Sequence, residues 1–420
     1  MFEKYISCSD CRRTYTMDCL VFRCETCGGS LEVSYDYDKL RSMGLAARMK
    51  TRPFGHARYM EFYPVPNIIS MGEGGTPLVP SINIGKNLDF HLYFKNETQN
   101  PTGSFKDRGS SVELAKMLQF SQMSVKNTWG KRIKRDSSGR PLVVCASTGN
   151  MGASVASYSV PAGANCTIIT PHDTAPIKLQ QILAYGAKVY KIPGDYTKAA
   201  EMVYEAFMKY GIYILGDYLY RREGTKSVGF EIADQFGSME LMSNDKFLSP
   251  DYIFCPVGNG TLISAIWKAF LELNELGMIQ KLPKIAGVQA AGCSPIVRAF
   301  ETDREIKPVK GKTIATAIEC GDPLDGKRVL ETIKESEGFM VAVPDKQILE
   351  ARDVLARKEG IFAEPGGAAA LAGLLHSGVP SESSVVCIVT GHGLKSPFTD
   401  VKGSTGKMGS GPKALKSVFS

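Results

Sequence analysis

Short, almost uninterrupted apolar runs alternate with helical patterns along the chain from about residue 90 onward. The runs are rich in β-branched residues, as is typical of strands buried on both faces of a sheet. Apolar positions spaced three and four residues apart predict helices between the runs, for example over residues 262–273 and 346–360. We expect strands at residues 91–96, 141–147, 165–170, 187–192, 251–257, 284–290, 338–343 and 383–390.

Strands that alternate with helices predict parallel sheets and an α/β fold class. The strands are too many for one small sheet, so we expect two parallel-sheet α/β domains with a cofactor cleft between them. The expected large domain combines residues 41–104 and 220–400, and the small domain covers residues 105–219. A small zinc-ribbon-like module at residues 1–40 precedes them, and a flexible tail at residues 401–420 follows.

The N-terminal module carries two CxxC motifs, "CSDC" and "CETC", whose cysteines are Cys8, Cys11, Cys24 and Cys27. Two such pairs at this spacing have the ligand arrangement of a zinc ribbon, so we expect a metal site formed by all four thiolates. The alternative is a degenerate knuckle that packs without zinc.

Composition excludes several classes of protein. With 43% hydrophobic and 22% charged residues, the 420-residue chain has an ordinary globular composition. A formal net charge of +7 is too weakly clustered to indicate nucleic-acid binding. We find no apolar run long enough for a signal peptide or a membrane span, and Cys145 and Cys255 lie inside apolar runs. We therefore expect a soluble, reduced, cytoplasmic protein.

The basic segment at residues 121–140 interrupts the alternation of strands and helices. An exposed loop explains its polar composition, and a patch that binds phosphate or a partner is the alternative.

A glycine- and hydroxyl-rich loop follows the strand expected at residues 141–147. It contains Ser147, Thr148, Gly149 and Asn150 and leads into a helix of small residues. Ligands of parallel α/β sheets bind beyond the carboxyl ends of the strands. Backbone N–H groups at the start of a helix suit an anion, and we expect Ser147, Thr148 and Gly149 to bind a substrate carboxylate.

Two more loops of this kind follow later strands. The first contains Gly258, Asn259, Gly260 and Thr261, and its glycines permit close approach of a phosphate. The second contains Thr390 within "VTGHGLK". A tight turn explains each of these loops alone equally well. The occurrence of three such loops in one chain is what indicates a ligand site.

Lys106 occupies an unfavourable place in "NPTGSFKDRGSS", residues 100–111. The apolar spacing that follows puts it in the first turn of a helix, where the helix dipole disfavours a cation. Such a position suits an amine that acts in its neutral form. A lysine for a Schiff base, a phosphate cradle, a partner for a ring nitrogen and a carboxylate site are together what pyridoxal phosphate requires.

The motifs resemble those of the threonine synthase family, which belongs to the tryptophan-synthase-β-like, fold type II pyridoxal-phosphate enzymes. The matching segments are "GEGGTPL", "NPTGSFKDRG", "ASTGN", "KLQQILAYGAKV", "PVGNG", "TIATAI", "GIFAEPGGAAALAGL" and "VTGHGLK", and the resemblance extends from the CxxC module to about residue 396. It implies that Lys106 forms the Schiff base, that Asn150 lies beside the 3-hydroxyl of the cofactor, that residues 258–261 hold its phosphate, and that Thr390 faces its ring nitrogen.

The resemblance also implies a lyase that converts O-phosphohomoserine and water to threonine and phosphate, acting as a homodimer without nucleic-acid or membrane partners. Arg221 and Lys226 are the cations expected at the substrate phosphate. The chain has Leu215 and Gly216 where the family usually has Asn-Ser. This departure keeps two alternatives open: a cysteate-synthase-like replacement enzyme acting on O-phosphoserine, and a threonine or serine dehydratase. A non-catalytic interaction protein is a third, which the intact "SFKDRG" disfavours.

Overall fold

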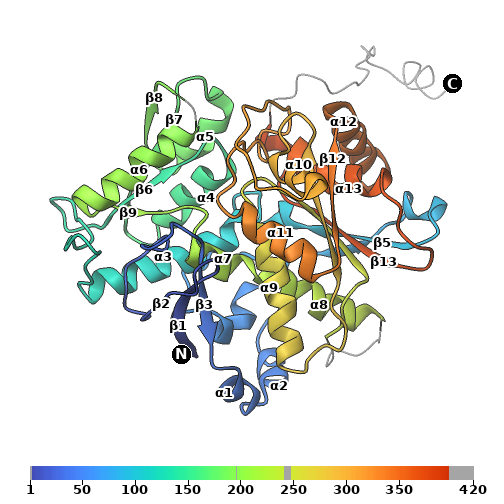
Figure 1. The fold of residues 1–420 in the computed structure, drawn as a ribbon, viewed down its shortest axis with the longest axis horizontal. Helices are drawn as coiled ribbons and strands as arrows, with labels where there is room; N and C mark the ends of the chain where they lie inside the picture. Colours follow the sequence, from blue (N-terminus) through green and yellow to red (C-terminus); the bar gives the residue numbers. More distant parts are fainter. Residues whose placement is uncertain (1, 195, 241–246, 397–420) are drawn as a thin grey trace, which may run out of the picture.

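Three sheets organise the structure, a computed structural model that describes residues 2–194, 196–240 and 247–396. Figure 1 shows a smaller sheet with its helices at the upper left, a larger sheet on the right, and the N-terminal module at the lower left. The predicted tail at residues 401–420 lies outside the described residues.

The larger sheet has six strands in the order β12-β11-β10-β13-β5-β4. They are β4 (Leu78–Pro80), β5 (His91–Asn96), β10 (Tyr252–Pro256), β11 (Lys284–Ala290), β12 (Phe339–Val343) and β13 (Ser384–Val389). All neighbours pair in parallel except β4, which runs antiparallel to β5. The prediction of a purely parallel sheet is therefore wrong at this edge. β4 and β5 are close in sequence, and a short connection permits only antiparallel pairing.

The smaller sheet is parallel, with four strands in the order β8-β7-β6-β9. They are β6 (Leu142–Ala146), β7 (Asn165–Pro171), β8 (Lys188–Ile192) and β9 (Tyr213–Ile214). The helices α4 (Asn150–Ser159), α5 (Pro176–Ala184) and α6 (Tyr196–Tyr210) connect them. Every strand predicted from the apolar runs is present in one of these two sheets. The strands of the smaller sheet all fall inside the predicted small domain, whose boundaries remain a prediction.

The N-terminal module forms the third sheet, which is antiparallel and made of β1 (Glu3–Cys8), β2 (Thr14–Tyr15) and β3 (Leu31–Tyr35). Leu31, Val33 and Tyr35 alternate inward along β3 and are buried. Arg222 fastens the module to the rest of the protein, because its guanidinium donates to the Leu31 carbonyl at 2.7 Å. The short helices α1 (Tyr37–Arg41) and α2 (Leu45–Lys50) follow.

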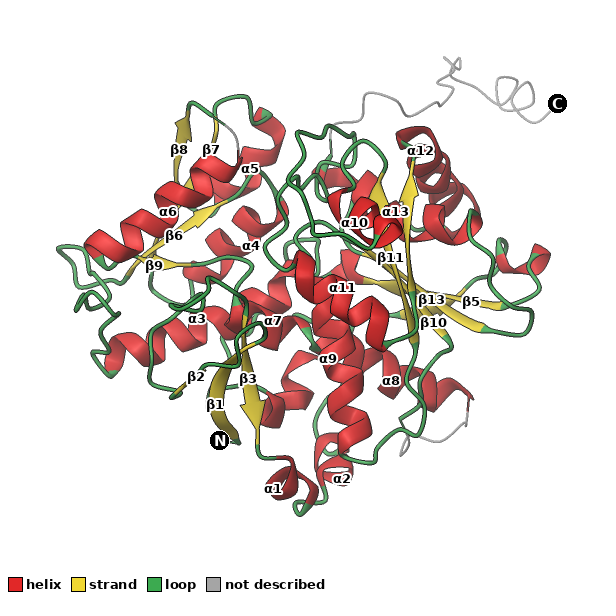
Figure 2. Cartoon of the chain, in the orientation of Figure 1, coloured by secondary structure: helices red, strands yellow, loops and turns green. Residues whose placement is uncertain are grey.

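Four helices, α3 (Lys106–Gln122), α7 (Leu219–Thr225), α8 (Ser227–Glu240) and α9 (Thr261–Glu275), lie at the centre and base of the molecule in Figure 2. The larger sheet also carries α10 (Pro295–Thr302), α11 (Gly326–Glu335), α12 (Asp345–Val354) and α13 (Pro365–Leu375). α13 consists almost entirely of small residues because it packs closely on the sheet: a Cβ at Gly373 would meet Val288 Cγ2 at 2.5 Å. Short 3₁₀ helices cover His56–Phe62, Gly85–Asn87, Glu97–Gln99 and Gly393–Lys395, and a π-helical turn covers Leu355–Glu359.

The segment at residues 121–140 is mostly exposed, as the loop interpretation predicts, although Asn127 and Ile133 are buried. Among the helices of the described residues, we find none with the length and apolar character that crossing a bilayer requires.

Candidate active site

A cavity of about 880 Å³ lies where the loops at the carboxyl ends of β6, β7, β10 and β13 come together. Parallel sheets place ligand sites at these ends, because the loops and helix N-termini that follow the strands converge there. Site residues predicted after strands of the smaller sheet and after strands of the larger sheet line this same cavity. The residues that line it include Lys106, Ser147, Thr148, Gly149, Asn150, Gly258, Asn259, Gly260, Thr261 and Thr390.

Lys106 begins helix α3 and extends its amine into this cavity. The amine is 3.1 and 3.4 Å from the two carboxylate oxygens of Asp217, and its side chain is 16% exposed. Asn259 donates to the same carboxylate at 2.8 Å. Burial disfavours the charged carboxylate, but the charges of Lys106 and Arg221, helped by the Asn259 amide, keep the pKa of Asp217 below its ordinary value. The charged form of Asp217 therefore holds the lysine in place.

Asp217 was missed by the sequence-based assignment, although its position was informative. It follows β9 by three residues and so lies at the carboxyl end of a parallel strand. The two-residue strand was too short to recognise from its apolar pattern.

The N-terminus of α9 lies at the cavity wall. Gly260 has φ of 97°, a left-handed conformation that favours glycine. A Cβ at this position would also meet Val329 Cγ2 at 2.5 Å, so the backbone conformation and the available space both require glycine. The carbonyl of Asn259 accepts from Asp325 N–H at 3.0 Å, which holds the loop against the segment that precedes α11. First-turn N–H groups of a 15-residue helix suit a phosphate.

The opposite wall is built by Asn150, Glu364 and Thr390. The Asn150 amide donates to Glu364 Oε1 at 2.5 Å, and burial raises the pKa of that carboxyl group. The Thr390 hydroxyl makes no hydrogen bond with any described residue, so it is available to a ligand. Ser147 Oγ accepts from Gly152 N–H at 2.8 Å and so anchors the start of α4 beside the cavity.

The structure does not bring Arg221 to the cavity, contrary to the prediction. Arg221 is fully buried on α7, where it donates to Glu113 Oε2 at 2.6 Å, to the Gly216 carbonyl at 3.0 Å and to the Lys106 carbonyl at 3.0 Å. α7 packs between α3 and α9, so the charge of its arginine is neutralised inside the protein. Arg221 thus supports the backbone of Lys106 from behind.

Lys226 is likewise absent from the cavity lining. It is fully buried, and its amine lies 2.8 Å from Glu223 Oε2 and 2.9 Å from Glu272 Oε1. Because two carboxylates already pair with this ammonium group, it is not available to a ligand in the cavity.

Two other lysines do line the cavity. Lys178, on α5, donates to the Thr316 hydroxyl across the cavity, and Lys395 donates to the Thr102 carbonyl at 2.6 Å. Burial lowers the pKa of both amines, an effect that the Glu364 carboxylate partly opposes. Lys178 is the first residue of "KLQQILAYGAKV", one of the segments that resemble the family. No role was predicted for this lysine from the sequence.

The four cysteines of the N-terminal module come together. Their sulfurs lie within 4.8 Å of one another, with 3.5 Å between those of Cys8 and Cys27 and 3.5 Å between those of Cys11 and Cys24. Four thiolates around zinc at about 2.3 Å would stand about 3.8 Å apart, so this donor set fits a tetrahedral site. The Tyr15 hydroxyl donates to Cys24 Sγ at 3.4 Å.

Comparisons with known proteins agree with this geometry. The family described as "Pyridoxal-phosphate dependent enzyme" matches residues 69–391. The protein named threonine synthase of Methanocaldococcus jannaschii is 40% identical over 409 residues, 94% of each chain. The protein of that name from Methanosarcina acetivorans is 38% identical over 94% of this chain and 93% of its own. Among solved structures, diaminopropionate ammonia lyase from Escherichia coli matches with a TM-score of 0.62 and 15% identity, covering 94% of this chain and 95% of that one.

The last likeness shows the fold alone, whereas the first two extend over nearly the whole length of both proteins. With Lys106, the glycine-rich start of α9 and the Thr390 hydroxyl in one cavity, the chain belongs to the threonine synthase family of pyridoxal-phosphate dependent enzymes.

Proposed function

We propose that this chain is a pyridoxal-phosphate-dependent lyase that converts O-phosphohomoserine and water to threonine and phosphate. One observation carries the proposal: a protein named threonine synthase is 40% identical over 94% of both chains. The chemistry of the cavity described above supports it.

The residues of the cavity fit pyridoxal phosphate. Lys106 would attach it, residues 258–261 would hold its phosphate, Thr390 would face its ring nitrogen and Asn150 its 3-hydroxyl. When bound, the cofactor supplies an electron sink for negative charge that develops on carbon atoms of the substrate.

Lys106 is the group placed to move protons. With cofactor and substrate bound, Nζ of Lys106 would be the group that takes and returns protons at the substrate carbons. Asp217 orients Nζ from 3.1 Å. Positioned proton transfer of this kind contributes roughly 10²- to 10⁴-fold to a rate.

The substrate's two anionic groups require separate sites. Ser147, Thr148 and Gly149 at the start of α4 suit the carboxylate. We assign the phosphate to Lys178 and Lys395, which line the cavity, in place of Arg221 and Lys226, which do not.

The substrate is tested by comparing phosphate release from O-phosphohomoserine and O-phosphoserine with the purified holoenzyme. We expect turnover of the first with threonine as product. Preferential turnover of O-phosphoserine, or ammonia and a keto acid formed from unphosphorylated serine or threonine, would refute the assignment. Neither Leu215 nor Gly216 lines the cavity.

We also propose that the cluster of Cys8, Cys11, Cys24 and Cys27 binds one structural zinc ion, because its four sulfurs are close enough to share a tetrahedral site. A homodimer and a cytoplasmic location remain predictions, and light scattering of the purified protein tests the first.

A further inference from the structure

A second cavity, of about 910 Å³, lies beside the catalytic one, and Tyr196 lines both. Five segments surround it: the second CxxC motif with the residue before it, the loop after α3, one face of α6, Tyr218 just before α7, and residues 322–324. Its volume is in the range of small-molecule sites, roughly 300–1,000 Å³. Aromatic side chains dominate its wall, with Trp129, Tyr196, Tyr204 and Tyr218 together with Met208.

Several polar side chains that line this cavity have no hydrogen-bond partner in the described part of the protein. The guanidinium of Arg23 is half-buried and makes no hydrogen bond or ion pair with any described residue. The hydroxyls of Tyr196, Tyr204 and Tyr218 likewise find no partner among the residues that the structure covers. Without a partner in that part of the chain, the cation and the hydroxyls are available to an anionic ligand.

The rim provides a negative charge as well. Asp322 lines the cavity, is exposed, and forms no ion pair within the described ranges. The other carboxylates of the lining are already engaged, since Glu201 pairs with Lys198 at 3.1 Å and Glu25 lies 3.9 Å from Arg13. One free cation, one free anion and an aromatic wall are what a zwitterion with an apolar side chain requires.

The two cavities share a wall. Tyr196 lines both, and Tyr218 directly follows Asp217, the partner of Lys106. The segment that contributes Asp322 to the second cavity contributes Cys320 to the catalytic one, and Cys320 contacts the Asn259 amide oxygen at 3.0 Å. A ligand in the second cavity would therefore contact Tyr218, which directly follows the Asp217 that holds Lys106.

We propose that this second cavity is a regulatory site for a small α-amino acid with an apolar or aromatic side chain. Its carboxylate pairs with Arg23 and the tyrosine hydroxyls, its ammonium with Asp322, and its side chain packs against Trp129 and Met208. Binding shifts the shared wall and changes the affinity of the catalytic cavity for its substrate. The site itself is independent of the proposed function, whereas the effect on substrate affinity rests on it.

Binding is measured without catalysis through tryptophan fluorescence. The chain has two tryptophans: Trp129 is 49% exposed at the cavity, and Trp267 is buried at 4%. L-phenylalanine and L-leucine should change the Trp129 emission of the holoenzyme saturably, and Trp129→Phe should abolish the change. L-phenylalaninamide, which lacks the carboxylate, and L-aspartate, which lacks the apolar side chain, should bind at least about tenfold more weakly.

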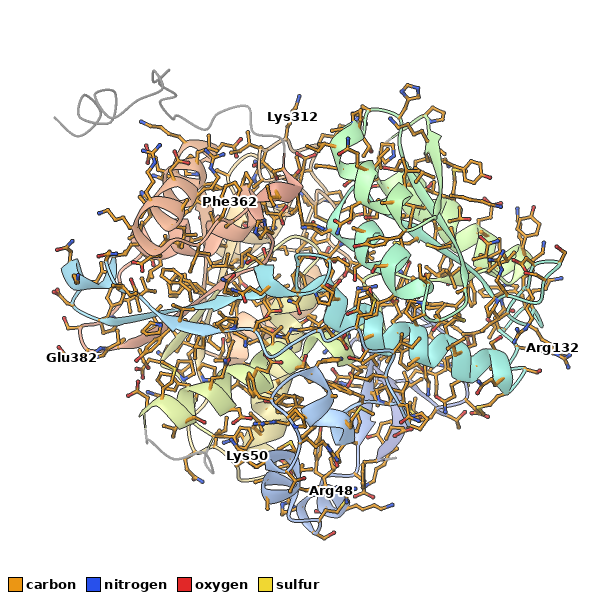
Figure 3. The ribbon with its side chains drawn as sticks, turned by 180° about the vertical axis from the view of Figure 1, so that it is seen from behind. Arg48, Lys50, Arg132, Lys312, Phe362 and Glu382 are labelled. Atoms are coloured by element: carbon orange, nitrogen blue, oxygen red, sulfur yellow. The ribbon has the colours of Figure 1, made fainter. Side chains whose placement is uncertain are left out.

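Arg23→Gln should weaken binding of L-phenylalanine by about tenfold or more, because it removes a charge-assisted contact. The matched control is Arg132→Gln, an exposed arginine that points outward in Figure 3 and does not line the cavity. In the wild type L-phenylalanine should also change the KM for O-phosphohomoserine, and this change should disappear in Arg23→Gln while basal activity stays.

The proposal is overturned if no apolar amino acid changes the Trp129 emission, as when a second copy of the chain covers this face. It is equally overturned if Arg23→Gln and Arg132→Gln bind L-phenylalanine alike. Binding that follows the expected pattern without turnover of O-phosphohomoserine would support the site and reject the proposed reaction, so the two failures are distinguishable.

Discussion

Replacing Arg221 by methionine separates a structural role from a role in phosphate binding. Arg221 is fully buried and donates hydrogen bonds to Glu113, Gly216, Lys106 and Ser110 at 2.6–3.1 Å. Removing one partner of a buried ion pair costs about 3–5 kcal/mol, since the other charge is left unpaired. We therefore expect Arg221→Met to lower the thermal midpoint of the protein clearly.

The unpaired partner makes this loss depend on pH. Burial already raises the pKa of Glu113 to about 7, even with Arg221 beside it, and the substitution should raise it further. A carboxyl group whose folded pKa exceeds its unfolded value takes up a proton on folding, so it destabilises the protein as the pH rises above about 4.5. The deficit of Arg221→Met should thus be larger at pH 8 than at pH 6, and Arg221→Met/Glu113→Gln should recover part of it.

Lys178→Met should show the opposite pattern. Lys178 is partly exposed, so its loss should cost little stability. A charge-assisted hydrogen bond to phosphate contributes about 1.5–3 kcal/mol, which corresponds to a roughly 10- to 150-fold decrease in kcat/KM. Inorganic phosphate should inhibit this variant more weakly, whereas Lys188→Met, an exposed lysine outside the cavity lining, should behave as the wild type.

The measurements are thermal unfolding by fluorescence at two pH values and inhibition of threonine formation by phosphate. If Arg221→Met retains wild-type stability and loses phosphate inhibition, Arg221 binds the substrate phosphate and the assignment to Lys178 is wrong.

Three further predictions concern single residues elsewhere. Lys106→Ala should remove activity and the visible absorbance of covalently attached cofactor while the protein still folds, and retained turnover would contradict its role. Burial lowers the pKa of His56 to about 4, against 6.5 in the unfolded chain, so the unfolded state alone gains this proton as the pH falls between those values. The wild type should therefore lose up to about 3 kcal/mol over that range relative to His56→Gln, and equal slopes of stability against pH would exclude the effect. Purified protein should contain about one zinc per chain by elemental analysis and Cys27→Ser much less, whereas an equal metal content in both would place the ion elsewhere.

Local sequence patterns were enough to predict the strands, the start of α3 and several site loops of this protein. Continuous apolar runs predicted the strands of both α/β sheets, because a strand buried on both faces needs apolar residues at every position. The sequence also predicted Lys106 in the first turn of a helix, because the apolar spacing that marks this helix begins within a few residues of Lys106. The same holds for the CxxC pairs and the glycine loops of residues 256–260 and 389–395. Each of these features is encoded by neighbours along the chain.

Partnerships between distant segments were decided only by the tertiary structure. Asp217 approaches Lys106 across 111 residues, and Glu113 neutralises Arg221 across 108. The sequence alone does not show whether a charged side chain faces a cavity or a buried partner of opposite charge. For this reason the sequence predicts Arg221 and Lys226 at the substrate and gives no role to Lys178. Which charges remain free for a ligand depends on the packing of α3, α7 and α9 against one another, because only that packing determines which charges are already paired inside the protein.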